Sequence, residues 1–275
     1  DTSNLVTSTL TRQVPYNNYS LNFDGTDDYI ETASHPIDFT TGNFTCSAWI
    51  NVANDGNHQG IFGIRNSTST ALQFYVRNTN KLYSYNGSND VFSTSTITND
   101  VWNHVVLVQN GSNKEFYING VLDNTVAQGN GSTSTATFKI GYTGHGSEYL
   151  NGKVSNCAIF DEALTSTEVM KLYNSGVPGD LSSFNPQPVS WWSLGSDSYF
   201  NGSNWICPDL ISTNNGTSAN MDDDALIGDA PNSTANGTST NMAIDANLIG
   251  DAPNSSNNSF SVNMGYADRE TSVPS

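Results

Sequence analysis

Two short segments combine aromatic rings with polar groups in the way that a sugar-binding surface requires. They read Asn-Asp-Gly-Asn-His-Gln over residues 54–59 and Tyr-Thr-Gly-His-Gly-Ser-Glu-Tyr over residues 142–149. An aromatic ring can stack on a sugar ring, and a small number of fixed polar groups can orient it. The sequence therefore predicts that a glycan site would use Asp55, Asn57, His58, Tyr142, His145 and Tyr149.

Further aromatic residues fall in predicted strands and have two interpretations. Tyr75, Tyr83 and Tyr85 either line a binding face or pack within the sheet with their hydroxyls in water. Trp49 and Trp102 stand in apolar runs, so we expect them in the core.

The carboxylates and histidines show no arrangement that predicts catalysis. Hydrolysis of a glycosidic bond needs two carboxyl groups about 5–9.5 Å apart, but Asp161 and Glu162 are adjacent and would face opposite sides of a strand. The acidic run at 222–224 lies in a repetitive segment away from any predicted strand. The 4 histidines are scattered and accompany no nucleophile motif. We therefore expect a protein without enzymatic activity.

The charge balance excludes some classes of partner. The chain has 275 residues, with 26 acidic and 9 basic side chains and a formal net charge of −17 at pH 7. A nucleic-acid-binding protein needs a basic surface to displace counterions, and anionic lipid also attracts basic segments. The sequence contains no apolar run of about 18 residues, the length that spans a bilayer. The expected partners therefore include neither nucleic acid nor a membrane interior.

Residues 19–160 show the pattern of many short strands. Apolar and polar residues alternate in runs such as 19–23, 44–50, 72–76 and 102–109, and Asn-Gly or Asp-Gly pairs separate many of the runs. This spacing predicts an all-β sandwich or barrel. One short helix is expected after Thr165, because Thr165 and Glu168 form a capping box and Gly176 marks a stop.

The last third of the chain is repetitive and polar. Residues 215–233 read NGTSANMDDDALIGDAPNS, and residues 236–255 read NGTSTNMAIDANLIGDAPNS. This composition cannot form a core of its own, and two units are fewer than the roughly three that a stacked repeat fold needs. We expect an extended arm that docks on the main domain or on a neighbouring subunit through Met221, Leu226, Ile227, Met242, Leu248 and Ile249.

Six motifs occur in the order and at the spacing of a known family. They are LNFDGTDDYI at 21–30, FTCSAWI at 44–50, WNHVV at 102–106, FYING at 116–120, IG at 140–141 with LNGKV at 150–154, and ALTSTE at 163–168. Together they resemble the laminin-G-like branch of the concanavalin A-like lectin/glucanase family. The resemblance implies an antiparallel β-sandwich of the jelly-roll type with one short helix. The predicted domains are an N-terminal extension (1–18), the jelly roll (19–176), a connector (177–212) and the polar arm (213–275).

The connector contains a Trp-rich segment that looks like one that normally precedes the first family motif. It begins with Trp191 and Trp192 and continues to Trp205. Either a second domain begins here and is cut short, or this strand folds back and completes the sandwich of its own chain or of a neighbour. We expect docking, because exposed aromatic patches are costly.

The resemblance also implies a metal site. In relatives, the turn of the first motif and a late strand lie side by side and can hold calcium through oxygen ligands. The matching residues here are Asp24, Gly25, Asp28 and Asn156, with asparagine in a place where aspartate is common. The alternative interpretation is that the aspartates only form turns. The clustered E-x-D-x-E pattern of the family's hydrolases does not occur in this sequence.

The repeats beside a jelly roll also resemble virion proteins of marine tailed phages. This resemblance implies a non-enzymatic structural protein on the surface of a virus particle, as a capsid decoration or a tail fibre. Its partners would be other virion subunits and cell-surface glycans. The alternative is a secreted carbohydrate-binding module or a divergent glycoside hydrolase of the same fold.

Overall fold

The computed structural model describes residue 16, residues 18–231, and the dipeptides 248–249 and 269–270. Residues 16 and 18–231 belong to one unit, Pro15–Pro231, and the two dipeptides belong to a second unit. In the second unit, β18 (Leu248–Ile249) pairs in parallel with β19 (Arg269–Glu270). The rest of the predicted arm beyond 231, including Met242, and nearly all of the predicted N-terminal extension lie outside the described residues.

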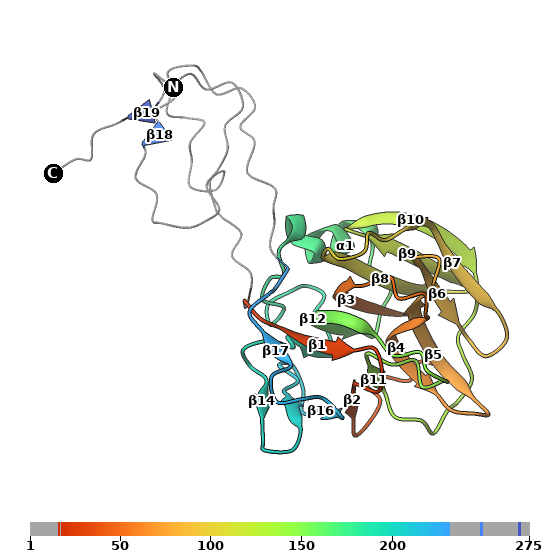
Figure 1. Cartoon of the computed structure of the whole chain (residues 1–275). Coiled ribbons are helices and arrows are strands. Elements are labelled where there is room, and N and C mark those ends of the chain that lie inside the picture. The colour runs from red at the N-terminus through yellow and green to blue at the C-terminus, as the bar shows by residue number, and fades with distance from the viewer. Residues whose placement is uncertain (1–15, 17, 232–247, 250–268, 271–275) are drawn as a thin grey trace. The chain divides into compact units, whose positions relative to one another are not determined.

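The unit Pro15–Pro231 contains two antiparallel sheets (Figure 1). The eight-stranded sheet has the order β10 (Val121–Ala127), β9 (Asn113–Ile118), β8 (Asn103–Asn110), β3 (Phe44–Val52), β12 (Asn151–Phe160), β1 (Ser20–Asp24) and β17 (Leu226–Ile227), with β13 (Ser190–Trp192) also paired to β12. The nine-stranded sheet has the order β14 (Tyr199–Phe200), β15 (Trp205–Cys207), β16 (Gly216–Ala219), β2 (Tyr29–Thr32), β11 (Lys139–Ile140), β4 (Gln59–Arg65), β5 (Thr70–Val76), β6 (Lys81–Tyr85) and β7 (Asp90–Thr96). The predicted all-β antiparallel sandwich is therefore confirmed.

The core lies between the two sheets and follows the alternation of the strands. Every second residue of a strand points inward, so Leu72, Phe74 and Val76 of β5 are buried in one apolar cluster with residues of the opposite sheet, such as Ile50 and Leu107. The residues that alternate with them, beginning with Gln73 and Tyr75, point to the other side of the nine-stranded sheet. We call that side the outer face.

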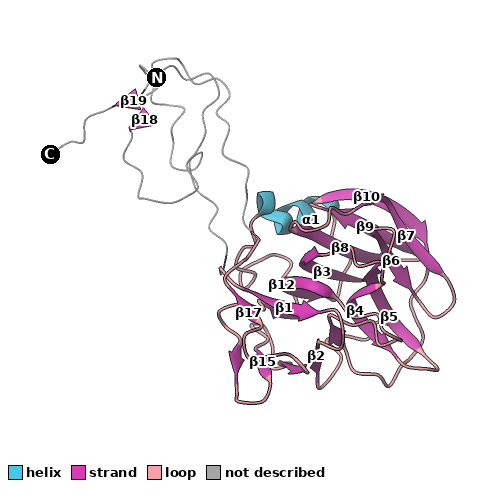
Figure 2. Cartoon of the chain, in the orientation of Figure 1, coloured by secondary structure: helices cyan, strands magenta, loops and turns pink. Residues whose placement is uncertain are grey.

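The helix α1 (Ser166–Tyr173) covers the other side of the eight-stranded sheet (Figure 2). Its predicted capping box is confirmed: the Thr165 side chain accepts from the Glu168 amide, and the Glu168 side chain accepts from the Thr165 amide. The helix buries Val169 and Leu172 in a second apolar cluster. The structure ends the helix at Tyr173, and a short 3-10 turn (Asn174–Gly176) follows. Within the described ranges, no helix combines the length and the apolar character needed to cross a bilayer.

The segment 190–231 is built into both sheets. Trp191 and Trp192 of β13 face opposite sides, so Trp192 lies in the main core and Trp191 lies in the cluster under α1. β16 pairs with β2 over four residue pairs, and β17 pairs with β1. Of the two interpretations of the Trp-rich segment, the structure thus shows the strand that pairs within its own chain.

The first repeat is part of the sandwich rather than part of an arm. Met221 is buried in the main core, Leu226 packs against that core, and Pro231 is also buried. The Asp229 carboxylate accepts a hydrogen bond from the Trp102 indole at 3.2 Å and one from the Lys153 ammonium. The predicted boundary at 213 therefore lies inside the unit. A polar segment can dock in this way because its backbone completes sheet edges and only a few apolar side chains need burial.

Candidate functional site

A loop from Gly141 to Leu150 crosses the outer face of the nine-stranded sheet. It fits there because β4 carries glycine at positions 60 and 63. A Cβ atom at Gly60 would lie 2.3 Å from the Thr143 nitrogen, and a Cβ at Gly63 would lie 2.3 Å from the Thr143 carbonyl oxygen. Only glycine permits so close a backbone approach. The two glycines of β4 therefore place the second predicted glycan segment directly on the sheet.

The Glu148 carboxylate joins the two predicted segments. Its Oε1 lies 3.4 Å from the His58 Nδ1 and 3.7 Å from the His145 Nδ1. Its Oε2 accepts hydrogen bonds from the Thr143 hydroxyl at 2.5 Å and from the Gln73 side-chain amide at 3.3 Å. The structure thus brings His58 and His145, one from each predicted glycan segment, to the carboxylate of Glu148, a residue that was not among the predicted glycan residues.

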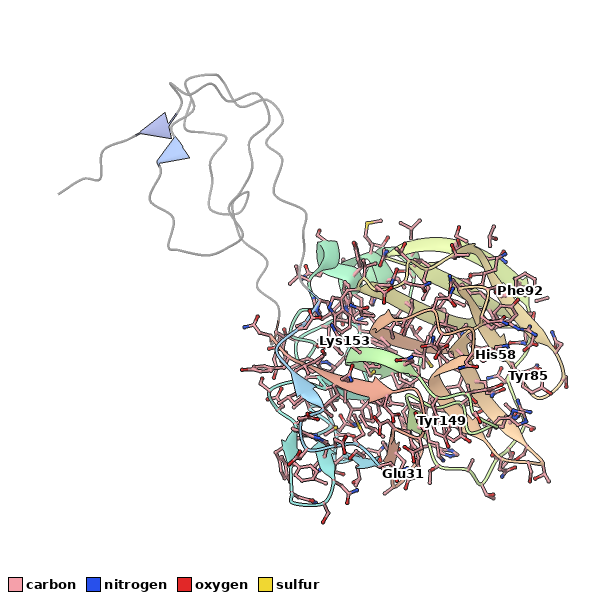
Figure 3. All side chains as sticks on the ribbon, viewed as in Figure 1. Glu31, His58, Tyr85, Phe92, Tyr149 and Lys153 are labelled. Carbon is pink, nitrogen blue, oxygen red and sulfur yellow. The ribbon has the colours of Figure 1, made fainter. Side chains whose placement is uncertain are left out.

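Tyr142 and Tyr149, near the beginning and the end of the loop, form a stacked pair. Their ring centroids are 4.1 Å apart with an interplanar angle of 10°, and the Tyr29 ring of β2 lies 5.7 Å from Tyr142 and 6.5 Å from Tyr149. Burial and the hydrogen bond to Tyr149 raise the pKa of the Tyr142 hydroxyl. Both rings are only partly buried, so the cluster presents aromatic surface beside Glu148, which precedes Tyr149 in the chain. Figure 3 labels Tyr149 and His58 in this part of the molecule.

Asp55 and Asn57 lie in the exposed loop that precedes β4. The Asp55 carboxylate accepts from the Asn57 amide at 2.9 Å, from the Gln59 side chain at 3.3 Å and from the Asn151 side chain at 3.2 Å. Asp55 therefore shapes its own loop and ties it to β12. Four of the six predicted glycan residues, His58, Tyr142, His145 and Tyr149, thus lie on the outer face. Asp55 and Asn57 lie in the loop before the first residue of β4.

A row of aromatic rings crosses β5, β6 and β7 on the same face. The ring centroids of Tyr75 and Tyr83 are 5.6 Å apart, and those of Tyr83 and Phe92 are 5.0 Å apart. His58 lies 5.8 Å from Tyr75 and connects the row to the Glu148 hub. Tyr75 and Tyr83 are buried within the row, whereas Phe92 is 43% exposed. The sequence analysis did not select Phe92. Its position two residues after Asp90, in a strand where residues alternate between the two faces, could have placed it on the same face as Asp90.

The predicted metal ligands are only partly assembled. Asp24, Asp27 and Asp28 bring carboxylate oxygens within 4.8 Å of one another, and Gly25 forms the turn between them with φ of 76°. Burial raises the pKa of Asp28 to about 6. Carboxylate oxygens are the ligands that calcium prefers, so these three residues are the ones that would hold a calcium ion here.

Asn156 lies apart from these aspartates in the sheet. The register pairs Asp24 with Asn151, and Asn156 lies five residues further along β12, roughly 16 Å away at strand spacing. Asn156 has a left-handed backbone (φ 48°) at the irregularity of β12 against β3, and its backbone N–H donates to the Ser193 carbonyl at 2.9 Å. The irregular strand thus directs Asn156 toward the Trp-rich segment instead of the aspartate turn.

One hollow in the described part of the molecule lies away from this face. It has a volume of about 570 Å³, stands beside the start of α1, and is lined by residues that include Glu115, Tyr117, Leu122 and Glu162. None of the predicted glycan residues lines it.

A protein-family model described as the concanavalin A-like lectin/glucanases superfamily matches residues 24–170. No curated protein sequence matches the chain. Among solved structures, a candidate carbohydrate-binding protein from Bacteroides ovatus superposes with a TM-score of 0.62 at 19% identity, over 80% of this chain and 62% of that one. At this identity the likeness shows the fold, and the chain spans less than two thirds of that protein.

Two further structures align less closely. A heptameric SAP-like pentraxin from Limulus polyphemus gives a TM-score of 0.47 at 19% identity, over 66% of this chain and 93% of that one. A sialidase from Trypanosoma rangeli gives 0.41 at 17% identity, over 50% of this chain and 23% of the enzyme.

Proposed function

This chain belongs to the concanavalin A-like lectin/glucanase superfamily, and on that premise we propose that it is a non-enzymatic carbohydrate-binding module. The outer face of the nine-stranded sheet is its site. The observation that carries this proposal is the convergence of the loop 141–150 with the aromatic row of β5–β7 around Glu148. Partly exposed rings beside fixed polar groups are what a sugar ligand needs.

The contacts of Glu148 support a binding role over a catalytic one. A general acid or base must reach the proton that it transfers, and each oxygen of Glu148 already has partners from the protein itself. This carboxylate holds the loop and the two histidines in place. It is a positioning group for a surface, and we infer that the face binds glycans without cleaving them.

A glycan array with matched variants tests this function. Tyr149→Ala and His58→Ala should each weaken binding about tenfold or more, because each removes a group that the face presents to the ligand. Tyr199→Ala is the control, since Tyr199 is an exposed tyrosine of the same sheet, on β14. Reducing ends should not accumulate when the parent protein is incubated with its ligand. Binding that survives both site variants, or steady release of reducing ends, would contradict the proposal.

We further propose that the module is carried on the surface of a virus particle, as a capsid decoration or a tail fibre, among other virion subunits. The docking of the first repeat supports this, because it shows how such a segment can attach to a sandwich. The second repeat keeps the same anchors: Met242, Asp251 and Pro253 correspond to Met221, Asp229 and Pro231. A second copy of an attachment segment suits a protein that must be held on a larger assembly.

Electron microscopy of purified particles tests the virion role. Regular, stoichiometric copies of the sandwich should decorate the capsid or the tail. The alternative is a free secreted carbohydrate-binding protein, for which the protein would stay in the supernatant when particles are sedimented. That result would remove the virion role and leave the glycan-binding face as it is.

A further inference from the structure

The few basic residues of this acidic chain are unevenly distributed. Nine lysines and arginines stand against 26 acidic residues in the sequence. Among the described ones, Lys114 is buried in the core, Lys153 pairs with Asp229, and Lys171 lies on α1. The remaining cations described in the unit Pro15–Pro231 are all on the outer face: Arg65, Arg77, Lys81 and Lys139. Arg269 belongs to the second unit.

Three of these cations form a row along β6. Lys81, Tyr83 and Tyr85 of β6 all point to the outer face. The Arg65 guanidinium lies 4.9 Å from the Tyr85 ring centroid, the Arg77 guanidinium lies 4.9 Å from that of Tyr83, and the Lys81 ammonium lies 5.3 Å from that of Phe92. Tyr83 and Phe92 face one another across β6 and β7, so the Arg77 and Lys81 charges lie over neighbouring rings, and the Arg65 charge lies over Tyr85, further along β6. We call it the cation row, Arg65–Arg77–Lys81.

The two ends of the cation row have no carboxylate partner among the described residues. Arg77 in the middle lies 3.6 Å from Asp90. Arg65 donates at 2.7 Å to the neutral side-chain oxygen of Gln73, and no described acidic group lies within ion-pair distance of Arg65 or Lys81. Arg65 and Lys81 are half-buried on the proposed binding face and have no described carboxylate partner there, although the chain is rich in carboxylates. They are therefore available to an external anion.

We propose that the cation row binds an acidic glycan, one that carries uronate carboxylates or sulfate esters. Arg65 and Lys81 pair with acidic groups spaced along the glycan, and the exposed ring of Phe92 stacks on a sugar between charges. The planar guanidinium of Arg65 suits a carboxylate or sulfate because it can donate two parallel hydrogen bonds. This inference rests on the proposed function and names the ligand class of that same face.

The net charge of −17 does not oppose this assignment at close range. At physiological ionic strength the Debye length is about 8 Å, so carboxylates on the far side of the sandwich are largely screened from the outer face. Acidic groups close to the cation row are already engaged, Asp90 by Arg77, Glu148 by the loop and Asp123 by the backbone amides of Thr94 and Ser95 in β7. The local charge of the cation row therefore governs the encounter with a polyanion.

Pairs of polysaccharides that differ only in charge test the proposal. Polygalacturonate is compared with its methyl ester, and chondroitin sulfate with desulfated chondroitin, by biolayer interferometry at low and at physiological salt. We expect the charged member of at least one pair to bind more tightly, with affinity that falls as salt rises. The uronate pair and the sulfate pair distinguish the two sources of acidic groups.

The matching variants are Arg65→Gln and Lys81→Gln, each of which should lower affinity for the charged member about tenfold, since a charge-assisted contact is worth about one decade. Arg65→Lys keeps the charge but not the two parallel hydrogen bonds, so it should lose less binding than Arg65→Gln and still bind more weakly than the parent. Lys171→Gln removes one charge on α1 and should change nothing, and thermal unfolding of each variant confirms that it folds. Equal binding of charged and neutral members, with the glutamine variants unaffected, would overturn the acidic-glycan assignment and leave the proposed function standing. If neither these polysaccharides nor any array glycan binds, the proposed function fails as well.

Discussion

Replacing Gly63 with alanine should push the loop 141–150 off the sheet that it crosses. The new Cβ would meet the Thr143 carbonyl oxygen at 2.3 Å and the Tyr142 carbonyl oxygen at 2.4 Å, where ordinary contacts begin near 3.4 Å. Both atoms belong to the backbone and cannot rotate away, so the loop must retreat by about 1 Å. Overpacking of this kind costs about 1–3 kcal/mol, and weakening the Glu148 hydrogen bonds adds about 1 kcal/mol. We expect Gly63→Ala to lower the free energy of unfolding by about 3 kcal/mol.

Urea unfolding and glycan binding, measured on the same variants, check this prediction. Gly129→Ala is the control, because nothing lies within 4 Å of a Cβ at Gly129, and its stability should stay within about 0.5 kcal/mol of the parent. Gly63→Ala should also bind glycan more weakly under conditions where it is still folded, since Glu148 and Tyr149 move with the loop. A Gly63→Ala protein with the stability and affinity of the parent would refute the idea that this loop is seated on β4.

Three further predictions concern charged groups. Asp229→Asn should lower stability by about 1 kcal/mol, because the partly exposed pair with Lys153 loses its charge and the first repeat is held less firmly; urea unfolding measures it, and an unchanged midpoint would contradict it. Burial lowers the pKa of Lys114 to about 7. Above pH 7 the native state therefore holds the neutral amine, whereas the unfolded chain keeps its proton up to about pH 10. The free energy of unfolding should rise over this range, because deprotonation then costs the unfolded chain progressively less than at pH 7. Lys114→Met should abolish that rise and be more stable at pH 7 by about 2 kcal/mol, whereas a persisting slope would argue against the assignment to Lys114. Burial raises the pKa of Asp28 to about 6. The stability that its protonated form provides is therefore complete below pH 4 and lost as the pH rises through 6. The free energy of unfolding of Asp28→Asn should exceed that of the parent by about 2 kcal/mol at pH 7.5 and equal it at pH 4. Calcium should raise the Tm of the parent and not that of Asp28→Asn, and equal shifts would exclude the aspartate turn as the calcium site.

Local signals explain what the sequence could predict. The alternation of β5 and the capping box at Thr165 and Glu168 are properties of a few neighbouring residues, and each specifies its element without reference to the rest of the chain. Composition was misleading for the first repeat, because its polar residues suggested an arm. Its attachment depends on backbone pairing with β1 and β2 and on single residues such as Met221, which a measure of average polarity cannot detect.

Register explains why Asn156 lies apart from the aspartate turn. The resemblance placed the first motif and the late strand side by side, and β1 and β12 do pair. The register sets Asp24 opposite Asn151, and Asn156 lies beyond the paired residues 151–154, at an irregularity of β12 where its own backbone is left-handed. Asparagine tolerates this backbone conformation better than most residues. A residue that looked like a ligand in sequence is thus better explained by the path of the strand.

For the outer face, the sequence predicted which residue types take part but not how they are arranged in space. The aromatic and polar groups of the two loops are visible in the sequence. The second loop lies on the sheet because β4 has glycine at positions 60 and 63. Glu148 contacts His58, which is 90 residues away in the sequence. The cation row arises in the same way, since Arg65 and Lys81 come from different strands and meet rings of β6 and β7 only after the sheet has formed. Charge that is scarce in the sequence becomes concentrated in space. That concentration, more than any single motif, is the physical argument for an acidic ligand.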